Sequence, residues 1–279
     1  MILVTGASGC LGSKVADLLD DVWAPDRSEL DLERPADVFR TIIRMRPKVI
    51  FHAGAWTDVD ACETNPQRAH VVNWVSTRAI ASAAIRLDAI LVYISTDYVF
   101  GGEKDLYNEN DEPNPVNVYG RTKLLGEREA LRVPQSYVVR TSWVFGPGGK
   151  TLLSRFLDYG AQGKPLTLIT DQVSRPTYVM HLASLVLDFA RGRLPFGVYH
   201  LAGSADVTYA DFVKRGLELA GIKTDLRLVR SSELNRPAKR PLRSSLSSEL
   251  YEALTGKRVP GWEETLEEYV EWWINSKGK

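Results

Sequence analysis

The chain has 279 residues, enough for one large domain or two closely packed lobes, and its 44% hydrophobic and 25% charged content is that of a globular protein. Its 35 basic and 35 acidic side chains cancel, and it has no long charge run or bilayer-length apolar stretch, which argues against nucleic acid and membrane as partners. Two cysteines, and a start without the basic region of a signal peptide, favour a cytoplasmic location.

The first predicted unit is a strand, a glycine turn and a helix. Residues 2–5 predict a buried strand, and Gly6, Gly9 and Gly12 follow with GxxGxxG spacing before a helix. Glycines let the backbone approach a pyrophosphate, and a helix N-terminus stabilises its charge. The spacing differs from GxGxxG, so the position directly after a strand strengthens the signal. Cys10, at the helix start, is interpreted as a packing residue rather than an activated thiol. The predicted cofactor contacts here are Gly6, Ser8, Gly9, Cys10, Leu11 and Gly12.

A short second strand, 22–24, leads to residues that bear on the choice of cofactor. Asp26 lies about 20 residues past the turn, where an acidic side chain often bonds the adenosine ribose of NAD. Arg27 and Ser28 can instead hold the ribose 2′-phosphate of NADP. The expected cofactor is therefore NADPH or NADH, with a ligand-free polar loop as the alternative. Asp31 and Leu32 are further predicted contacts.

The third predicted strand, 49–51, ends in small residues that let a cofactor pass close to the backbone. The acidic loop 57–63 is interpreted as the cap of a following helix over residues 69–85 at least as readily as a metal-binding loop. The chain has no His/Cys cluster with zinc spacing, and we assign no metal ligands. The predicted cofactor contacts in this region are Ala53, Gly54, Ala55 and Thr57.

The central strand, 91–94, carries Ser95, Thr96 and Asp97 to its carboxyl end, where open α/β sheets bind ligands. Farther along, Tyr119 and Lys123 are four residues apart on a predicted helix and share one face. A lysine ammonium beside a phenol favours the phenolate and lowers the tyrosine pKa. The combination predicts a proton-transfer site.

A strand at 137–143 and a glycine-rich turn at 146–149 mark a boundary. We interpret residues 1–150 as a dinucleotide-binding domain and 151–279 as mainly a substrate-binding lobe, with about 168–205 returning to the first. The predicted fold is α/β: a Rossmann-like, doubly wound parallel sheet with a smaller C-terminal α/β lobe. Later helices are expected at 152–161, 181–191, 207–220 and 262–274, and strands at 166–169, 197–201 and 226–229.

Residues 236–244 are the most basic stretch of the chain. Arginine forks match phosphate oxygens, so Arg240 is a candidate for binding a diphosphate. Composition alone supports a solvated surface loop equally well.

These motifs resemble the extended short-chain dehydrogenase/reductase superfamily and, within it, the dTDP-4-dehydrorhamnose reductase family, over nearly the whole length. Gly6, Gly9 and Gly12 match the glycine motif, and Tyr119 with Lys123 matches YxxxK. Residues 95–100, 117–124 and 140–145 match narrower blocks of the reductase family. Arg240, Pro241, Ser244 and Leu246 resemble its RPxxSxL segment.

The resemblance implies reduction of dTDP-4-dehydro-L-rhamnose to dTDP-L-rhamnose by NAD(P)H, in an enzyme of which some relatives form homodimers. It implies that Tyr119 protonates the C4 oxygen, Lys123 holds the nicotinamide ribose, Thr96 bonds the carbonyl oxygen and Asp97 orients the sugar. Ser95, Tyr119 and Lys123 would contact the cofactor. The implied substrate contacts are Thr96, Asp97, Val99, Phe100, Tyr119, Trp143 and Arg240.

Three departures from the family pattern concern the substrate rather than the chemistry. Residues 171–177 correspond to the DQxGxPT segment of the family, with Ser174 in place of its glycine. Arg243 replaces the asparagine of RPxNS, and His52 replaces an asparagine. A nucleotide-sugar epimerase or dehydratase, or a regulatory subunit like methionine adenosyltransferase beta, is an alternative with the same fold. The sugar, the base, the preferred cofactor, the oligomeric state and the involvement of Mg²⁺ stay open.

Overall fold

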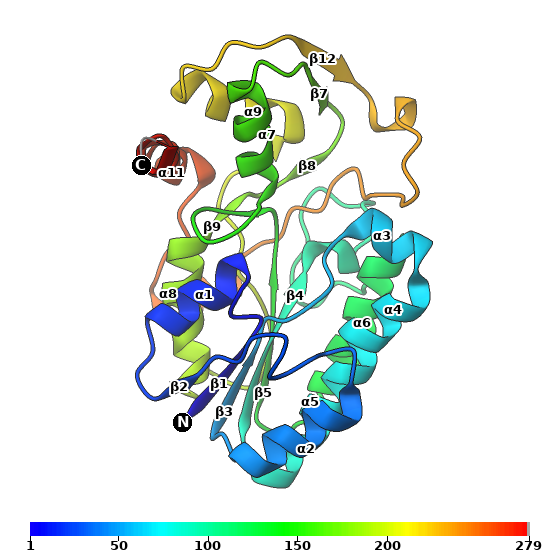
Figure 1. Cartoon of the computed structure of the whole chain (residues 1–279), viewed down its shortest axis with the longest axis vertical. Coiled ribbons are helices and arrows are strands. Elements are labelled where there is room, and N and C mark those ends of the chain that lie inside the picture. Colours follow the sequence, from blue (N-terminus) through cyan, green and yellow to red (C-terminus); the bar gives the residue numbers. More distant parts are fainter. Residues whose placement is uncertain (278–279) are drawn as a thin grey trace.

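Six strands form a parallel sheet in the larger lobe of the computed structural model, which describes residues 1–277 (Figure 1). Every strand pairing in this sheet is parallel. The order β10-β5-β4-β3-β1-β2 places a topological switch point between β1 and β3, where such sheets bind ligands. The strands are β1 (Ile2–Thr5), β2 (Val22–Trp23), β3 (Val49–His52), β4 (Ile90–Thr96), β5 (Ser136–Thr141) and β10 (Gly197–His200).

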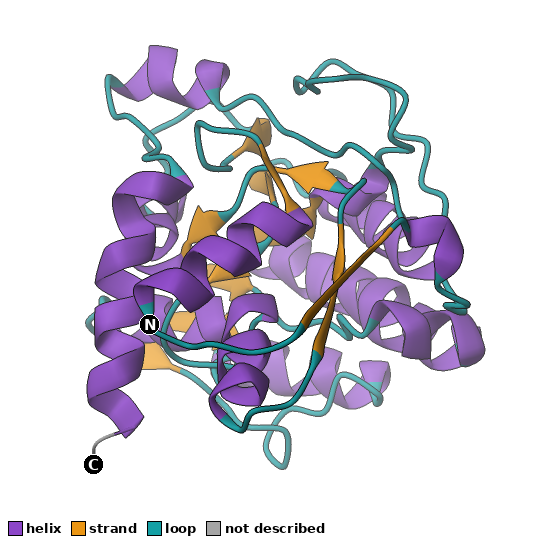
Figure 2. Ribbon diagram, turned by 90° about the horizontal axis from the view of Figure 1, so that it is seen from above, coloured by secondary structure: helices purple, strands orange, loops and turns teal. Residues whose placement is uncertain are grey.

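Both faces of the sheet are buried, because helices cover each of them (Figure 2). On β4, Val92 and Ile94 pack into the cluster beneath α1 and α8, whereas Leu91 and Tyr93 pack toward α2 and α5. This two-sided burial explains why the strands are continuous apolar runs in the sequence. The covering helices are α1 (Cys10–Asp17) and α8 (Val179–Ala190) on one face, and α2 (Pro35–Met45), α5 (Ser76–Leu87) and α6 (Val118–Ala130) on the other.

The helix predicted from 69 to 85 is divided. It consists of α4 (Pro66–His70), a π-helical turn at Val71–Val75, and α5. Asn73 in the π-helical turn accepts a hydrogen bond from the Trp56 backbone N–H at 2.7 Å and donates one to Thr122 Oγ1 at 3.1 Å. The turn therefore fastens the loop after β3 to α6.

The acidic loop before α4 is a capping segment. The helix α3 (Val59–Thr64) begins where the Asp58 side chain accepts a hydrogen bond from the Ala61 N–H at 3.0 Å. An acidic residue of the loop therefore caps a helix, but that helix is α3 and not the helix expected over residues 69–85.

A separate hydrophobic cluster holds the smaller lobe together, with Leu153, Phe212 and Tyr269 among its buried residues. Its short strands form three two-stranded sheets, β12-β7, β11-β8 and β6-β9. Its elements are β6 (Val144–Phe145), α7 (Leu152–Ala161), β7 (Leu166–Ile169), β8 (Val173–Ser174), β9 (Thr177–Tyr178), β11 (Val207–Thr208), α9 (Tyr209–Leu219), β12 (Leu226–Val229) and α11 (Trp262–Lys277).

The chain crosses between the lobes more than once. After β9 it returns to the sheet as α8 and β10, and again as α10 (Glu249–Thr255), whose Tyr251 is buried in the cluster beneath α8. The helix α10 was not predicted. The helix expected at 207–220 begins at Tyr209, because Val207–Thr208 pairs with β8 instead. The predicted fold class is confirmed. Within residues 1–277, no helix combines the length and apolarity needed to cross a membrane.

Candidate active site

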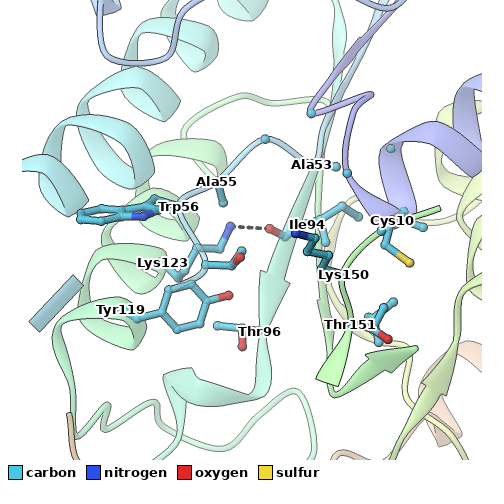
Figure 3. Close-up of a pocket in the computed structure, with 18 of the residues that line it drawn as sticks. Cys10, Ala53, Ala55, Trp56, Ile94, Thr96, Tyr119, Lys123, Lys150 and Thr151 are labelled. Carbon is cyan, nitrogen blue, oxygen red and sulfur yellow. Dashed lines mark hydrogen bonds between the residues drawn. The ribbon is translucent and has the colours of Figure 1, made fainter. Parts of the chain in front are cut away.

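A cavity of about 1020 Å³ lies at the carboxyl ends of β1, β3, β4 and β5, where the two lobes meet. In Figure 3, Tyr119, Lys123 and Thr96 gather on one side of it, and Cys10 and Thr151 lie on the other. The sheet contributes the strand ends, and the smaller lobe contributes α7 and residues near 236–240. The predicted residues that line it are Gly6, Ser8, Gly9, Cys10, Leu11, Gly12, Asp26, Arg27, Asp31, Leu32, Ala53, Gly54, Ala55, Thr57, Ser95, Thr96, Asp97, Tyr119, Lys123, Trp143 and Arg240.

The glycine turn after β1 packs directly on the turn after β3. Gly6 has φ +73°, and a Cβ on it would lie 2.6 Å from the Gly54 nitrogen. A Cβ on Gly12 would lie 2.2 Å from the Gly6 carbonyl oxygen. Side chains are therefore excluded at both positions, and the backbone itself forms this wall. Within the described chain no side chain caps the N-terminus of α1, so its backbone N–H groups can bind an anion.

Two buried hydroxyl groups in the cavity wall have no hydrogen-bond partner among residues 1–277: Ser95 Oγ and Thr141 Oγ1. Buried polar atoms are nearly always hydrogen-bonded, so these two are suited to bind a ligand. Together with the glycine turn, they make the cavity fit a dinucleotide. The sequence did not single out Thr141.

The loop after β2 uses part of its polar groups for its own structure. Asp26 Oδ1 accepts hydrogen bonds from the Ser28 N–H at 2.7 Å, the Ser28 hydroxyl at 2.6 Å and the Glu29 N–H at 3.2 Å. These bonds hold the pKa of Asp26 below its ordinary value. Ser28 does not line the cavity, so the structure does not support its predicted phosphate contact.

The predicted Tyr119–Lys123 pair lies on the first turns of α6. Asn117 caps this helix by accepting a hydrogen bond from the Gly120 N–H at 2.8 Å. Lys123 Nζ donates to the Ile94 carbonyl oxygen at 2.6 Å and lies 4.1 Å from the centre of the Tyr93 ring. This contact, drawn in Figure 3, directs the ammonium to the end of β4.

The expected lowering of the Tyr119 pKa is wrong for this structure. Burial raises the pKa of Tyr119 above its ordinary value, and the nearby Thr96 hydroxyl lowers it by less. Burial also lowers the pKa of Lys123 to about 7, against the opposing charge of Glu127. Tyr119 therefore keeps its proton near neutral pH and has a proton that it can donate.

Asp97 is buried and holds its neighbours in place. Its Oδ2 accepts hydrogen bonds from Ser244 Oγ at 2.5 Å and Ser174 Oγ at 3.3 Å, and its Oδ1 accepts one from Thr96 Oγ1 at 3.1 Å. Ser174 thus joins the smaller lobe to the end of β4. Burial raises the pKa of Asp97 to about 6.

This raised pKa predicts a specific pH dependence of stability. The folded protein binds the Asp97 proton more tightly than the unfolded chain, so the group stabilises the fold below its ordinary pKa of 3.8. That contribution is lost as the pH rises through about 6. Relative to wild type, Asp97→Asn should therefore gain up to about 3 kcal/mol of unfolding free energy between about pH 4 and pH 7. Denaturant unfolding at several pH values measures this, with Asp20→Asn controlling for loss of a surface carboxylate. Parallel curves for wild type and Asp97→Asn would contradict the prediction.

Two predicted substrate contacts are wrong. Val99 and Phe100 are both fully buried, in a cluster with Tyr107 and Leu246, and do not line the cavity. The 3-10 turn that follows Thr96 directs these side chains into the core, where the Phe100 ring stacks on Tyr107 at 4.1 Å.

Arg240 lines the cavity and is not a solvated surface residue. Its side chain is 11% exposed, and both terminal nitrogens bond Asp60 at 2.7 Å. The ion pair lowers the pKa of Asp60. Trp143 also lines the cavity, with φ +38°, a strained value for an aromatic residue, and its ring meets Tyr209 edge-on at 5.8 Å.

Several cavity residues were not predicted as contacts. Tyr98 and Gln172 lie within the family motifs at 95–100 and 171–177, and Arg236 lies within the basic stretch 236–244. Predicting every polar residue of these segments as a contact would have included all three. Trp56, Arg155 and Tyr209 carried no such signal, because the chain brings them to the cavity only through tertiary packing. The Cys10 thiol is half-buried beside Pro147, and burial raises its pKa to about 11, which agrees with the packing interpretation. Among residues 1–277 there is no group of three or more His, Cys, Asp or Glu side chains that could hold a metal ion.

Comparison with known proteins agrees with this geometry. The family model described as RmlD substrate binding domain matches residues 1–273. The dTDP-4-dehydrorhamnose reductase of Aggregatibacter actinomycetemcomitans is 34% identical over 283 residues, covering 95% of this chain and 96% of that protein. The chain belongs to the dTDP-4-dehydrorhamnose reductase family. The predicted family is thereby confirmed.

Another relative and a solved structure also match this chain over nearly its whole length. The spore coat polysaccharide biosynthesis protein SpsK of Bacillus subtilis is 32% identical, covering 97% of this chain and 96% of that protein. The crystal structure of dTDP-4-dehydrorhamnose reductase from Bacillus anthracis in complex with NADP has a TM-score of 0.92 and 30% identity, covering 97% of this chain and 98% of that chain. The structural similarity therefore includes the smaller lobe as well as the Rossmann-like lobe.

Proposed function

We propose that the protein uses NADPH or NADH to reduce the C4 keto group of a nucleotide-linked 6-deoxyhexose, converting dTDP-4-dehydro-L-rhamnose to dTDP-L-rhamnose. The observation that carries this proposal is that Tyr119, Lys123 and Thr96 converge in the cavity that also contains the glycine turn. Family membership supports the substrate class, and the NADP-bound relative from Bacillus anthracis supports the cofactor.

When bound, the nicotinamide cofactor supplies the hydride. Tyr119 retains its proton because it is buried, and its hydroxyl donates that proton to the oxygen that becomes an alkoxide. Thr96, next to Tyr119, has a single hydroxyl proton, which Asp97 Oδ1 accepts in this structure, and Thr96 would donate it to the same substrate oxygen in exchange for that bond. Lys123, whose Nζ bonds the Ile94 carbonyl oxygen near the end of β4, would hold the nicotinamide ribose. Donors aimed at a developing negative charge stabilise the transition state by several kcal/mol.

Asp97 has a positioning role in this proposal rather than direct contact with the sugar. Both of its carboxylate oxygens already accept hydrogen bonds, from Thr96 on one side and from Ser174 and Ser244 on the other. It therefore holds the Thr96 hydroxyl and ties the smaller lobe to the reaction centre.

The two lobes divide the work. We propose that residues 1–150 bind the cofactor and that the smaller lobe, with Trp143 at its edge, binds the nucleotide sugar. Gln172, Tyr209 and Arg236 line the cavity from that lobe. A homodimer and a cytoplasmic location stay predictions from the resemblance and the composition.

Replacing Arg240 tests the diphosphate contact. Arg240→Ala is expected to raise KM for the nucleotide sugar by about tenfold, with a smaller effect on kcat, because a charge-assisted bond to a phosphate oxygen is lost. Steady-state kinetics measure both constants. Asp60→Asn is the matched control, since it weakens the same ion pair but keeps the guanidinium. An unchanged KM in Arg240→Ala would remove Arg240 from the substrate site.

The proposed reaction is tested by the absorbance decay of NADH and of NADPH, measured separately, with dTDP-4-dehydro-L-rhamnose generated in the cuvette. Loss of absorbance with wild type and not with Tyr119→Phe is the expected result. Tightly copurified NAD without net consumption would favour an epimerase or dehydratase instead. Cofactor binding without turnover, together with copurification of a larger catalytic protein, would favour a regulatory subunit.

A further inference from the structure

Three charged side chains meet at the end of the cavity that lies beside Asp26: Arg27, Glu33 and Arg68. Glu33 Oε1 accepts hydrogen bonds from Arg68 Nε at 2.9 Å and Arg68 Nη2 at 2.7 Å, and also one from Arg27 Nη2. A single carboxylate oxygen is thus shared by two guanidinium groups, and Arg27 has a second, longer ion pair, from Nε to Asp31 Oδ1 at 3.5 Å. All three side chains line the cavity.

The three charged side chains are held by their contacts but remain partly exposed to solvent. The side chain of Glu33 is 35% exposed, that of Arg68 is 38% exposed and that of Arg27 is 66% exposed. The Arg68 guanidinium lies over the Trp56 ring, 4.6 Å from its centre, which restricts its orientation. A ligand can therefore reach the arginines, but only in competition with Glu33.

The neighbouring loop makes this competition relevant to the cofactor. The position after β2 is where dinucleotide folds contact the adenosine ribose, and an arginine there accommodates a 2′-phosphate. Asp26 Oδ1 accepts hydrogen bonds within its own turn, from the Ser28 N–H and from the Ser28 hydroxyl. Arg27 and Arg68 are the cations that line the cavity beside this loop.

We propose that Glu33 sets the cofactor preference of this protein by occupying the two arginines that would otherwise bind a ribose 2′-phosphate. This inference rests on the proposed function. A 2′-phosphate needs the guanidinium donors that Glu33 already holds, and its negative charge is repelled by the carboxylate. A cofactor that lacks the phosphate meets neither penalty. Glu33 therefore disfavours NADP(H) relative to NAD(H).

The test is equilibrium binding of NADP⁺ and of NAD⁺, measured separately by titration calorimetry with wild type and Glu33→Gln. The glutamine keeps the shape of the side chain and removes its charge. We expect the Kd for NADP⁺ to fall by about fivefold to tenfold and the Kd for NAD⁺ to change by less than about twofold. Because the arginines are partly exposed, the gain should shrink as the salt concentration rises. An unchanged Kd for NADP⁺, or an equal change for both cofactors, would overturn the role of Glu33.

Two further variants separate this role from a general change in charge. Arg27→Gln in the Glu33→Gln background should remove most of the gain for NADP⁺, since it removes one of the freed cations. Asp37→Asn, which removes an exposed carboxylate paired with Arg40 outside the cavity, should leave the ratio of the two Kd values unchanged.

If wild type binds neither cofactor, the proposed function itself fails. If it binds both and Glu33→Gln leaves their ratio unchanged, only the role of Glu33 fails.

Discussion

Tyr119→Phe is expected to lower kcat by about 100-fold or more and to leave the affinity for the cofactor within about twofold. Tyr119 is buried, and burial holds its pKa above the ordinary value, so the hydroxyl carries its proton at neutral pH. Phenylalanine keeps the ring and its edge-on contact with Tyr98 at 6.0 Å, but removes the only proton that this side chain can give. The chemical step is therefore affected far more than the fold.

Single-turnover kinetics with reduced cofactor and keto sugar measure this effect, together with a cofactor titration that shows that the site is intact. Tyr159→Phe is the matched control, because it loses a hydroxyl from a 48% exposed tyrosine at the rim of the same cavity. Near-normal turnover in Tyr119→Phe would exclude this residue as the proton donor, whatever the control showed.

The largest expected loss of stability follows from Arg140→Met, at about 3 to 5 kcal/mol. Arg140 on β5 and Glu127 on α6 are 4% and 2% exposed and form a bidentate pair, at 2.9 Å and 2.7 Å. Arg140 also lies 5.1 Å from the centre of the Phe100 ring and 3.3 Å from His200 Nε2. Removing the arginine leaves the Glu127 carboxylate buried without its partner, which is the costly arrangement.

Denaturant unfolding measures this loss of unfolding free energy. Two further variants test whether the unpaired buried carboxylate is its cause. Arg140→Met combined with Glu127→Leu should recover most of the stability, because a hydrophobic pair replaces a buried ion pair at little cost. Arg132→Met breaks the 3.1 Å ion pair with Glu129 at the C-terminal end of α6. Because the Arg132 side chain is 69% exposed, this loss should cost less than about 1 kcal/mol. A loss in Arg140→Met no greater than that in Arg132→Met would contradict the argument.

Local patterns in the sequence determined most of the elements and the centre of the site. The apolar run 91–94 predicted the core of β4, and the helix predicted at 152–161 has those bounds in the structure. The four-residue spacing of Tyr119 and Lys123 placed both side chains in the cavity, because that spacing corresponds to about one helical turn. The glycine turn is similarly local, since a strand, three glycines and a helix follow one another directly.

Only the tertiary structure decided which groups are buried and which groups pair. Arg240 meets Asp60, and Arg68 meets Glu33, across long stretches of intervening chain, so neither pair has a sequence spacing to reveal it. The same limit explains the errors at Val99 and Phe100, which continue the motif of Thr96 but turn into a cluster with Leu246. The expected direction of the Tyr119 pKa shift was also wrong, because the sequence shows the nearby lysine but not the burial that raises the pKa. Helix and strand periodicity depends on neighbours along the chain, whereas burial and charge pairing depend on residues that only folding brings together.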